Sequence, residues 1–375
     1  MSALLDDIDP DGLLEFSVVF TDRSLNSMSL AFQKVMTDIS SILREVYNAD
    51  GVALVPGGGT YAMEAVARQL AEGETVMVIR NGWFSYRWTQ IFEAAKLPAE
   101  EIVMMARRTG NDAQAAFAPA PIDEVVAKIH EARPSVVFAP HVETSAGMIL
   151  PDDYIKAITE AAHEVGALFV LDCIASGCAW VDMKALGVDV VISAPQKGWS
   201  ASPSAGLVMM SEAALERVRA RQSSSFAVDL GKWLTIMEAY ENGGHAYHAT
   251  MPTDALKGFR DVMLETKAYG FSRMKEAQWE QGHRVRALLE DKGFRSVAAD
   301  GFGAPGVVVC YTDRPELKTG SAFAAEGVQI AAGVPLMVGE GDGYSSFRIG
   351  LFGKDKLEDV DGSVARLKAV LDTVA

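Results

Sequence analysis

The stretch FVLDCIASGCAW (169–180), followed by VVISAPQKGWSASPSAGLVMM (190–210), decides the fold of this chain. Leu168–Leu171 is a short, fully apolar run, which predicts a strand buried on both faces of a sheet. Val188–Ile192 is a second run of this kind, interrupted by one Asp. Two such strands with one connection between them are typical of an open α/β sheet.

A carboxylate and an amine follow these two predicted strands. Asp172 lies at the carboxyl end of the first, and Lys197 comes within a turn of the second. Ligands of open α/β sheets bind at the carboxyl ends of the strands, so we expect both side chains to face one pocket from adjacent strands. A partly desolvated Lys can form a Schiff base with a carbonyl, and an Asp can keep a pyridine nitrogen protonated. The structural alternative is a turn-capping Asp and a surface Lys.

A glycine-rich loop lies between a predicted strand and a predicted helix in GVALVPGGGTYAMEAVARQL (51–70). Glycines let the backbone approach an anion closely, and the new helix offers free N–H groups at the positive end of its dipole. This arrangement predicts a phosphate cradle, although a plain strand–helix turn has the same pattern. It is not a Walker loop, because no Lys-Ser/Thr follows.

Several side chains near other predicted strand ends are candidates for ligand contacts. Trp83 and Phe84 follow an Asn-Gly turn, and each would otherwise fill core. Thr144 and Ser145 are hydroxyl donors at a strand end, where ordinary turn chemistry also uses them. Arg348 could bind a carboxylate with two parallel hydrogen bonds, or lie on an edge strand facing solvent.

The motifs together resemble the class V pyridoxal-phosphate aminotransferases, and among them the alanine/serine–glyoxylate type. The resemblance runs from about Asp50 to the C-terminus and is carried, in order, by LVPGGGTYAMEA (54–65), HVETSAGMILP (141–151), LDCIAS (171–176), SAPQK (193–197) and FRIGLFG (347–353). The Asp-to-Lys block is its most specific part.

The resemblance implies pyridoxal 5'-phosphate as cofactor, with Lys197 and Asp172 as catalytic residues and Arg348 as the residue that binds the substrate carboxylate. It also implies an aromatic ring on the cofactor, which aligns with Phe84, with Trp83 as the rival. The full set of implied cofactor-binding residues is Gly58, Gly59, Thr60, Phe84, Thr144, Ser145, Asp172, Gln196, Lys197, Tyr247 and Thr250.

The activity implied is transfer of an amino group from a small amino acid (alanine, serine or similar) to a 2-oxo acid such as glyoxylate or pyruvate. The family segment that resembles Tyr247…Thr250 reaches the cofactor phosphate of the other subunit, which implies a homodimer with shared active sites. The implied architecture is the fold type I of pyridoxal-phosphate enzymes, with a mostly parallel large domain and a smaller α+β C-terminal domain.

The chain has 375 residues, more than one core usually holds, so we expect two domains around one cleft. We expect an N-terminal arm and helix over 1–48, a large cofactor-binding domain over 49–254, and a connecting helix with a small domain over 255–375. Strands and helices alternate between 52 and 197, which favours a mostly parallel sheet.

Outside residues 52–197 the sequence predicts individual elements, without a regular alternation of strands and helices. EFSVVF (15–20) favours a short strand after a loose acidic lead-in over 1–12. Helical spacing predicts a helix over Leu25–Tyr47, with Asn26 or Ser27 as N-cap. A long helix is expected over 253–292 with a bend near Gly270. Strands are expected at 305–313, 327–333 and 345–350, before a closing helix over 357–374.

Composition excludes several classes of function. A net charge of −16 argues against a nucleic-acid partner. The chain has three cysteines, too few and too scattered for a disulfide framework or zinc site, which favours a cytoplasmic location. The acidic N-terminus is unlike a signal peptide, and no apolar run is long enough to span a membrane. His245 and His248 resemble a metal-binding HxxH pair, but no third ligand is evident.

Two rival functions keep the same fold. A cysteine desulfurase or other lyase of this type usually has His before the cofactor lysine and a mobile nucleophilic Cys. Here the preceding residue is Gln196, and Cys310 lies in the apolar run VVVCYT (307–312), where a thiol is normally inert. The other rival, a non-catalytic cofactor-binding regulator, carries a DNA-reading module for which the length and charge leave no room.

Overall fold

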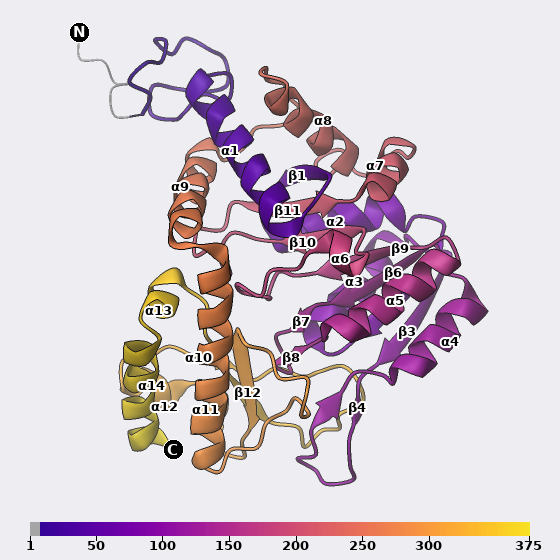
Figure 1. Ribbon diagram of the computed structural model, residues 1–375, viewed down its shortest axis with the longest axis vertical. Coiled ribbons are helices and arrows are strands. Elements are labelled where there is room, and N and C mark those ends of the chain that lie inside the picture. Colours follow the sequence, from indigo (N-terminus) through magenta and orange to yellow (C-terminus); the bar gives the residue numbers. More distant parts are fainter. Residues whose placement is uncertain (1–7) are drawn as a thin grey trace.

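The computed structural model describes residues 8–375, and a seven-stranded sheet forms its centre (Figure 1). The strand order across this sheet is β1-β11-β10-β9-β6-β2-β3. The strands are β1 (Gly51–Pro56), β2 (Thr75–Arg80), β3 (Glu100–Met105), β6 (Val136–Pro140), β9 (Leu168–Asp172), β10 (Val190–Ser193) and β11 (Ala205–Met210).

Only β11 runs against its neighbours in this sheet. It pairs antiparallel with both β1 and β10, whereas the pairs β10–β9, β9–β6, β6–β2 and β2–β3 are parallel. Every residue of β6, β9, β10 and β11 is buried, because helices cover both faces of a parallel sheet. The predicted fold class, α/β with a mostly parallel sheet, is confirmed.

Helices from the first two thirds of the chain cover the sheet. Helix α2 packs on β1, β10 and β11, α3 on β2 and β6, and α5 on β9. Helix α1 packs on α8 and α9 beside β1. Their bounds are α1 (Leu30–Tyr47), α2 (Gly59–Leu70), α3 (Trp83–Ala95), α4 (Ile122–Ala132), α5 (Asp152–Glu164), α6 (Met183–Leu186), α7 (Glu212–Arg219) and α8 (Leu230–Glu241).

Residues from Val285 to Val374 form a second apolar core, separate from that of the large sheet. Helices α9 (Thr253–Tyr269) and α10 (Phe271–Asp291) are separated at Gly270, whose φ of 108° suits glycine. A three-stranded antiparallel sheet has the order β12-β14-β13, and its strand β12 lies beside α10 (Figure 1). The remaining elements are β12 (Val307–Tyr311), α11 (Pro315–Lys318), α12 (Ser321–Ala325), β13 (Ala331–Ala332), β14 (Ser346–Gly350), α13 (Lys354–Glu358) and α14 (Val360–Val374).

Two short hairpins connect the two cores. One pairs β4 (Arg107–Arg108) with β5 (Phe117–Ala118), and the other pairs β7 (Val142–Glu143) with β8 (Met148–Ile149). Apolar side chains of both hairpins pack with Val297, Val309 and Leu336 of the C-terminal part. This contact places β12, which pairs with β14, beside the two hairpins.

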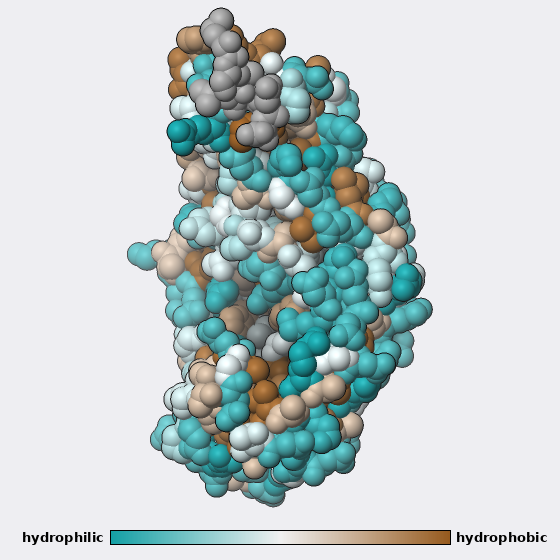
Figure 2. Space-filling model, turned by 90° about the vertical axis from the view of Figure 1, so that its left-hand side faces the viewer, coloured by the Kyte–Doolittle hydropathy of each residue, from teal (hydrophilic) through white to brown (hydrophobic). Residues whose placement is uncertain are grey.

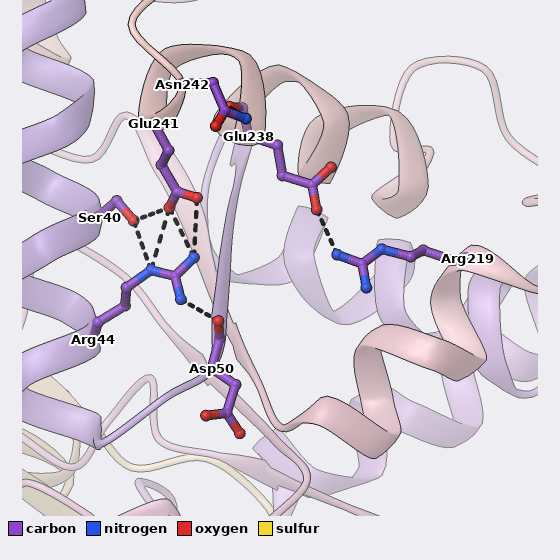
Figure 3. A network of polar contacts seen from close by, with 7 residues as sticks. All are labelled: Ser40, Arg44, Asp50, Arg219, Glu238, Glu241 and Asn242. Carbon is purple, nitrogen blue, oxygen red and sulfur yellow. Dashed lines mark hydrogen bonds and ion pairs between the residues drawn. The ribbon is translucent and has the colours of Figure 1, made fainter.

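A cluster of polar groups around Arg44 fixes the end of α1 against the sheet (Figure 3). Arg44 donates from Nη2 to both carboxylate oxygens of Glu241, at 2.9 and 3.0 Å, and from Nη1 to the carbonyl oxygen of Asp50. Ser40 completes the cluster by donating to Glu241. The side chains therefore tie α1, α8 and the start of β1 together.

Four element predictions are wrong. Residues 15–20 form no strand, because they lack a pairing partner within the described chain. Helix α1 begins at Leu30 with Ser29 as N-cap, since the Ser29 hydroxyl accepts from the Phe32 amide. Helix α8 (Leu230–Glu241) has no counterpart among the predicted elements. Over 327–333 only Ala331–Ala332 pairs as a strand.

Most other element predictions are confirmed within a few residues, including the break at Gly270, although the closing helix is divided into α13 and α14. The lead-in expected over 1–12 lies largely outside the described residues. The domain boundaries at 48/49 and 254/255 stay a prediction. Among residues 8–375, no helix has the length and apolar character needed to cross a membrane.

Candidate active site

Asp172 and Lys197 come from neighbouring parallel strands, as predicted. Asp172 ends β9, where it lies opposite Ile192 of β10 and Pro140 of β6. Lys197 follows the last residue of β10 in a tight turn. Both residues therefore lie at the carboxyl edge of the sheet, where open α/β sheets bind ligands.

The Asp172 carboxylate is buried and only partly hydrogen-bonded. The side chain is 7% exposed, and its Oδ1 accepts from the backbone N–H of Ile174 at 2.9 Å. Burial raises the pKa of Asp172 to about 6, and the charge of Glu143 adds to this, while Arg87 and Lys197 oppose it. In the described chain no residue donates to Oδ2, which leaves this oxygen for a cationic N–H donor.

Lys197 is half-buried and has no carboxylate partner within residues 8–375. Its Nζ lies 5.4 Å from the centre of the Phe352 ring. Burial lowers the pKa of Lys197, and the positive charges of Arg348 and Arg87 add to this, against the opposing effect of Asp172. An amine with a lowered pKa is closer to the neutral, nucleophilic form at physiological pH.

The glycine loop between β1 and α2 forms an open anion site. Gly58 is the N-cap of α2, and no side chain caps this helix. The backbone N–H groups of Gly58, Gly59 and Thr60 find no acceptor in the part of the chain that the structure describes. Free amides at a helix N-terminus suit a phosphate group, so the loop fits the phosphate of the implied cofactor.

Arg87 lies beside this loop and was assigned no cofactor contact from the sequence. Its Nη1 donates to the Thr60 Oγ1 at 3.0 Å, and its charge lowers the pKa values of both Asp172 and Lys197. Arg87 follows Phe84 by one helical turn on α3, a spacing that places both on one helix face. That spacing was the signal available in the sequence.

The Phe84 ring lies beside two arginine side chains. The guanidinium carbons of Arg87 and Arg348 lie 5.3 and 5.5 Å from its ring centre. The Trp83 ring instead packs beside Tyr86, with centroids 6.0 Å apart. These placements favour Phe84 over its rival as the ring that faces the ligand.

Arg348 is half-buried on β14 and offers an unpaired fork. Its Nε donates to the carbonyl oxygen of Ala332 at 2.8 Å, which fixes the plane of the guanidinium. Neither Nη atom has a hydrogen-bond or ion-pair partner among residues 8–375. Burial lowers the pKa of Arg348, partly offset by the charge of Glu143. A desolvated guanidinium with two free donors suits a bound carboxylate.

The two hydroxyl residues that follow β7, Thr144 and Ser145, differ in their hydrogen bonds. Ser145 is fully buried, donates to Glu143 at 2.6 Å and accepts from the Trp83 amide at 2.9 Å. Its proton is therefore not free for a ligand, which argues against the donor role expected from the sequence. Thr144 is half-buried and has no hydrogen bond within the described residues.

Glu143 is the main residue that sequence reasoning missed, although it lies in the quoted HVETSAG motif. It is fully buried and its two oxygens accept five hydrogen bonds. The signal available in the sequence was a carboxylate after an apolar strand and directly before two hydroxyl residues. A charge buried at such a place needs hydrogen-bond partners.

Three of the residues expected to contact the cofactor are exposed and lie apart from the site residues described above. Gln196 is exposed, and so are Tyr247 and Thr250, whose hydroxyls hydrogen-bond each other at 3.1 Å. No hydrogen bond joins any of the three to the glycine loop within residues 8–375.

The histidines and Cys310 have structural surroundings. His248 hydrogen-bonds the carbonyl oxygen of Phe226 at 2.7 Å, and no group of metal-ligating side chains is present in the described chain. His141 is buried against Ser176 at 2.7 Å, and burial lowers its pKa to about 3. Burial raises the pKa of Cys310 to about 12, which disfavours a thiolate nucleophile.

A family model described as Aminotransferase class-V matches residues 15–361. The 2-aminoethylphosphonate–pyruvate transaminase of Paraburkholderia phymatum is 26% identical over 360 residues, 93% of this chain and 89% of the relative. A soluble hydrogenase 42 kDa subunit of Anabaena cylindrica is 25% identical over 348 residues, 91% of this chain and 85% of the relative.

Solved structures with this fold include two glyoxylate aminotransferases. The alanine–glyoxylate aminotransferase of Nostoc sp. superposes with a TM-score of 0.77 at 22% identity, over 92% of this chain and 89% of the other. The ureidoglycine–glyoxylate aminotransferase of Bacillus subtilis gives 0.74 at 22% identity, over 96% and 89%. These likenesses agree with fold type I of the pyridoxal-phosphate enzymes.

Proposed function

The chain belongs to the class V aminotransferases, which use pyridoxal phosphate, and we propose that it moves the amino group of a small amino acid to glyoxylate or pyruvate. The observation that carries the substrate assignment is the unpaired guanidinium of Arg348, half-buried next to Phe84. Such a group favours a substrate carboxylate, which alanine, serine, glyoxylate and pyruvate all have.

In this proposal the Nζ of Lys197 would hold the cofactor. The same Nζ would take the α-proton of the bound substrate as a general base and return it as a general acid. Its lowered pKa favours the neutral form that can accept this proton. The bound cofactor supplies an electron sink for the bond that breaks.

The other residues bind and orient. We assign to the Asp172 Oδ2 the task of keeping the ring nitrogen protonated. The amides of Gly58, Gly59 and Thr60 hold the phosphate, with Arg87 beside them. Because Arg87 donates to Thr60, we assign it to phosphate binding and not to a second carboxylate of the substrate. Without a residue for a side-chain carboxylate, the site should favour small substrates.

The proposed function is tested by an amino-donor screen. Alanine, serine, aspartate, 2-aminoethylphosphonate and ureidoglycine are paired with glyoxylate, pyruvate and 2-oxoglutarate. We expect the highest specificity constants with alanine or serine and a two- or three-carbon oxo acid. Preference for 2-oxoglutarate or aspartate would contradict the small-substrate assignment.

Replacing Arg348 with Lys should lower the specificity constant for every carboxylate substrate. Lysine keeps the charge but loses the planar fork, and a hydrogen bond to a charged group contributes about 1.5–3 kcal/mol, roughly one to two powers of ten. An amine without a carboxylate should be much less affected. Steady-state kinetics with alanine, serine and a simple amine provide the measurement.

The matched control for this prediction is Arg107→Lys, an exposed arginine paired with Glu124. It should leave all constants unchanged. Equal losses for the amine and the amino acids in Arg348→Lys would show that Arg348 acts on folding or on cofactor placement.

A homodimer with shared active sites is supported by the exposed surface near the N-terminus. Residues 12–20 lie along the surface without secondary structure, and several large apolar side chains there and at the start of α1 are exposed: Leu13, Leu14, Phe16, Val18, Val19, Met28 and Leu30. All of these except Val18 and Val19 line a groove of about 740 Å³, and apolar residues gather at the top of Figure 2, near the N-terminal segment. Patches of this kind usually bind another protein surface.

Mixed dimers should recover activity that neither parent variant has. One parent carries Lys197→Ala and the other carries Tyr247→Phe with Thr250→Ala, because we assign these exposed hydroxyls to the partner's phosphate site. Random assembly leaves one intact site in each mixed dimer, so about a quarter of wild-type activity is expected from co-expressed chains. Activity no higher than the sum of the parents, or a fully active monomer in sedimentation, would contradict shared sites.

A cytoplasmic location is proposed on the cysteines. All three are buried and free, Cys173 and Cys178 in the large sheet region and Cys310 on β12. Proteins of oxidising compartments more often use their cysteines in disulfides.

A further inference from the structure

We propose that Glu143 is a positioning residue of the active site. Its buried carboxylate fixes the first turn of α3, and with it Phe84 and Arg87, and supplies a negative charge to the cofactor site. The inference rests on the proposed function, which it extends to a residue that touches neither substrate nor phosphate loop.

The hydrogen bonds of Glu143 all point at one helix start and one turn. Oε1 accepts from the amides of Phe84 and Ser145 at 3.2 and 3.0 Å and from the Ser145 hydroxyl at 2.6 Å. Oε2 accepts from the amide and hydroxyl of Ser85 at 2.9 and 2.7 Å. A side chain that accepts five hydrogen bonds and donates none is bound as an anion, the charge that a helix N-terminus favours.

The two serine hydroxyls extend this contact to the preceding turn. The Ser145 hydroxyl accepts from the Trp83 amide at 2.9 Å, and that of Ser85 accepts from Asn81 and Gly82 at 2.9 and 3.1 Å. Gly82 lies directly under the carboxylate, because a Cβ there would be 2.7 Å from the Glu143 Cδ. One carboxylate therefore satisfies, directly or through a hydroxyl, five consecutive amides from 81 to 85.

The turn held in this way carries two side chains of the site. The Phe84 ring lies within 5.5 Å of the guanidinium carbons of Arg87 and Arg348. Arg87 reaches Thr60 of the phosphate loop from the same helix turn. If the first turn of α3 moved, both the ring and the phosphate contact would move with it.

Glu143 also changes the charge balance of the site. The charged groups around the cofactor position are Lys197 after β10, Arg87 on α3, Arg348 on β14, Asp172 on β9 and Glu143 on β7. Glu143 has no ion-pair partner within the described part of the chain. Its charge raises the pKa values of Asp172 and Arg348, so its field reaches both sides of the site.

The test compares Glu143→Gln with the matched control Ser85→Ala. Glutamine keeps the shape but removes the charge, and its amide donors face the amides of α3. Ser85→Ala removes one hydroxyl relay and leaves the carboxylate charge in place. Two measurements are made: hydrogen exchange of residues 81–86 in the cofactor-free protein, and the absorbance of the cofactor-loaded protein as a function of pH.

We expect amide exchange at Phe84 and Ser85 to rise by about tenfold or more in Glu143→Gln, as expected for the loss of hydrogen bonds to a charged group. The midpoint of the absorbance titration should fall by about one pH unit, because a negative charge that favours the protonated chromophore is gone. Ser85→Ala should raise exchange while leaving the midpoint close to that of the wild type.

Unchanged exchange in Glu143→Gln would overturn the positioning role. An equal midpoint shift in both variants would overturn the electrostatic role, since only one of them loses the charge. If the wild type binds no pyridoxal phosphate, the proposed function fails. The exchange measurement on the cofactor-free protein still decides whether Glu143 fixes the start of α3.

Discussion

A Lys197→Ala variant should lose essentially all transamination while keeping its fold. Lys197 makes no ion pair in the described chain, so its removal breaks no salt bridge. General acid–base catalysis alone contributes about 10²–10⁴ in rate, and the covalent link to the cofactor is lost as well. Single-turnover conversion of bound alanine measures the loss, with Lys232→Ala, an exposed lysine of α8, as the control.

Added small amines separate the two roles of Lys197. A methylamine or ethylamine solution should restore part of the rate in the variant, with an effect that grows with the basicity of the amine. Rescue of this kind identifies the missing group as a proton carrier. Turnover of the unrescued variant within tenfold of the wild type would contradict the assignment.

Asp172→Asn should fold and bind the cofactor, yet turn over two to four powers of ten more slowly. An amide cannot hold the ring nitrogen proton by charge, and removing one partner of a buried ion pair typically costs roughly 3–5 kcal/mol. The matched control is Asp189→Asn, another buried carboxylate of the same region, which accepts from Phe169, Ser211 and His163. It should lower the melting temperature and leave the turnover of folded protein nearly unchanged.

Asp172→Asn should also stabilise the cofactor-free protein. Asp172 has a folded pKa of about 6, above its ordinary value of 3.8, so the folded state binds more protons and loses stability as pH rises between these values. A shift of this size corresponds to about 3 kcal/mol at pH 8. We expect a higher Tm for cofactor-free Asp172→Asn than for wild type at pH 8, and little difference at pH 4.

Most of the large sheet could be predicted from the sequence because its strands are buried on both faces. Leu168–Asp172 and Val190–Ser193 are nearly all apolar, so local composition decides them. Residues 15–20 show the limit of that reasoning. They have strand-forming residues but no neighbouring strand among residues 8–375, and pairing is a property of the tertiary structure.

The site was predictable where one motif contains the chemistry, as with Lys197 in SAPQK or Gly58 before α2. It was not predictable where the role depends on contacts between distant segments. Glu143 accepts from Phe84 and Ser85, 59 and 58 positions earlier, and its local sequence does not show which segment it contacts. The place of Arg87 beside the glycine loop was not predictable either, because its contact with Thr60 depends on how α3 packs beside α2.

The most direct test of the account is to locate the cofactor on the purified protein. Borohydride reduction fixes the cofactor on the amine that holds it, and peptide mass mapping then identifies that residue. We expect a single adduct on Lys197, absent from the Lys197→Ala variant treated in the same way. An adduct on another lysine, or a colourless protein that gains no absorbance with added pyridoxal phosphate, would contradict it.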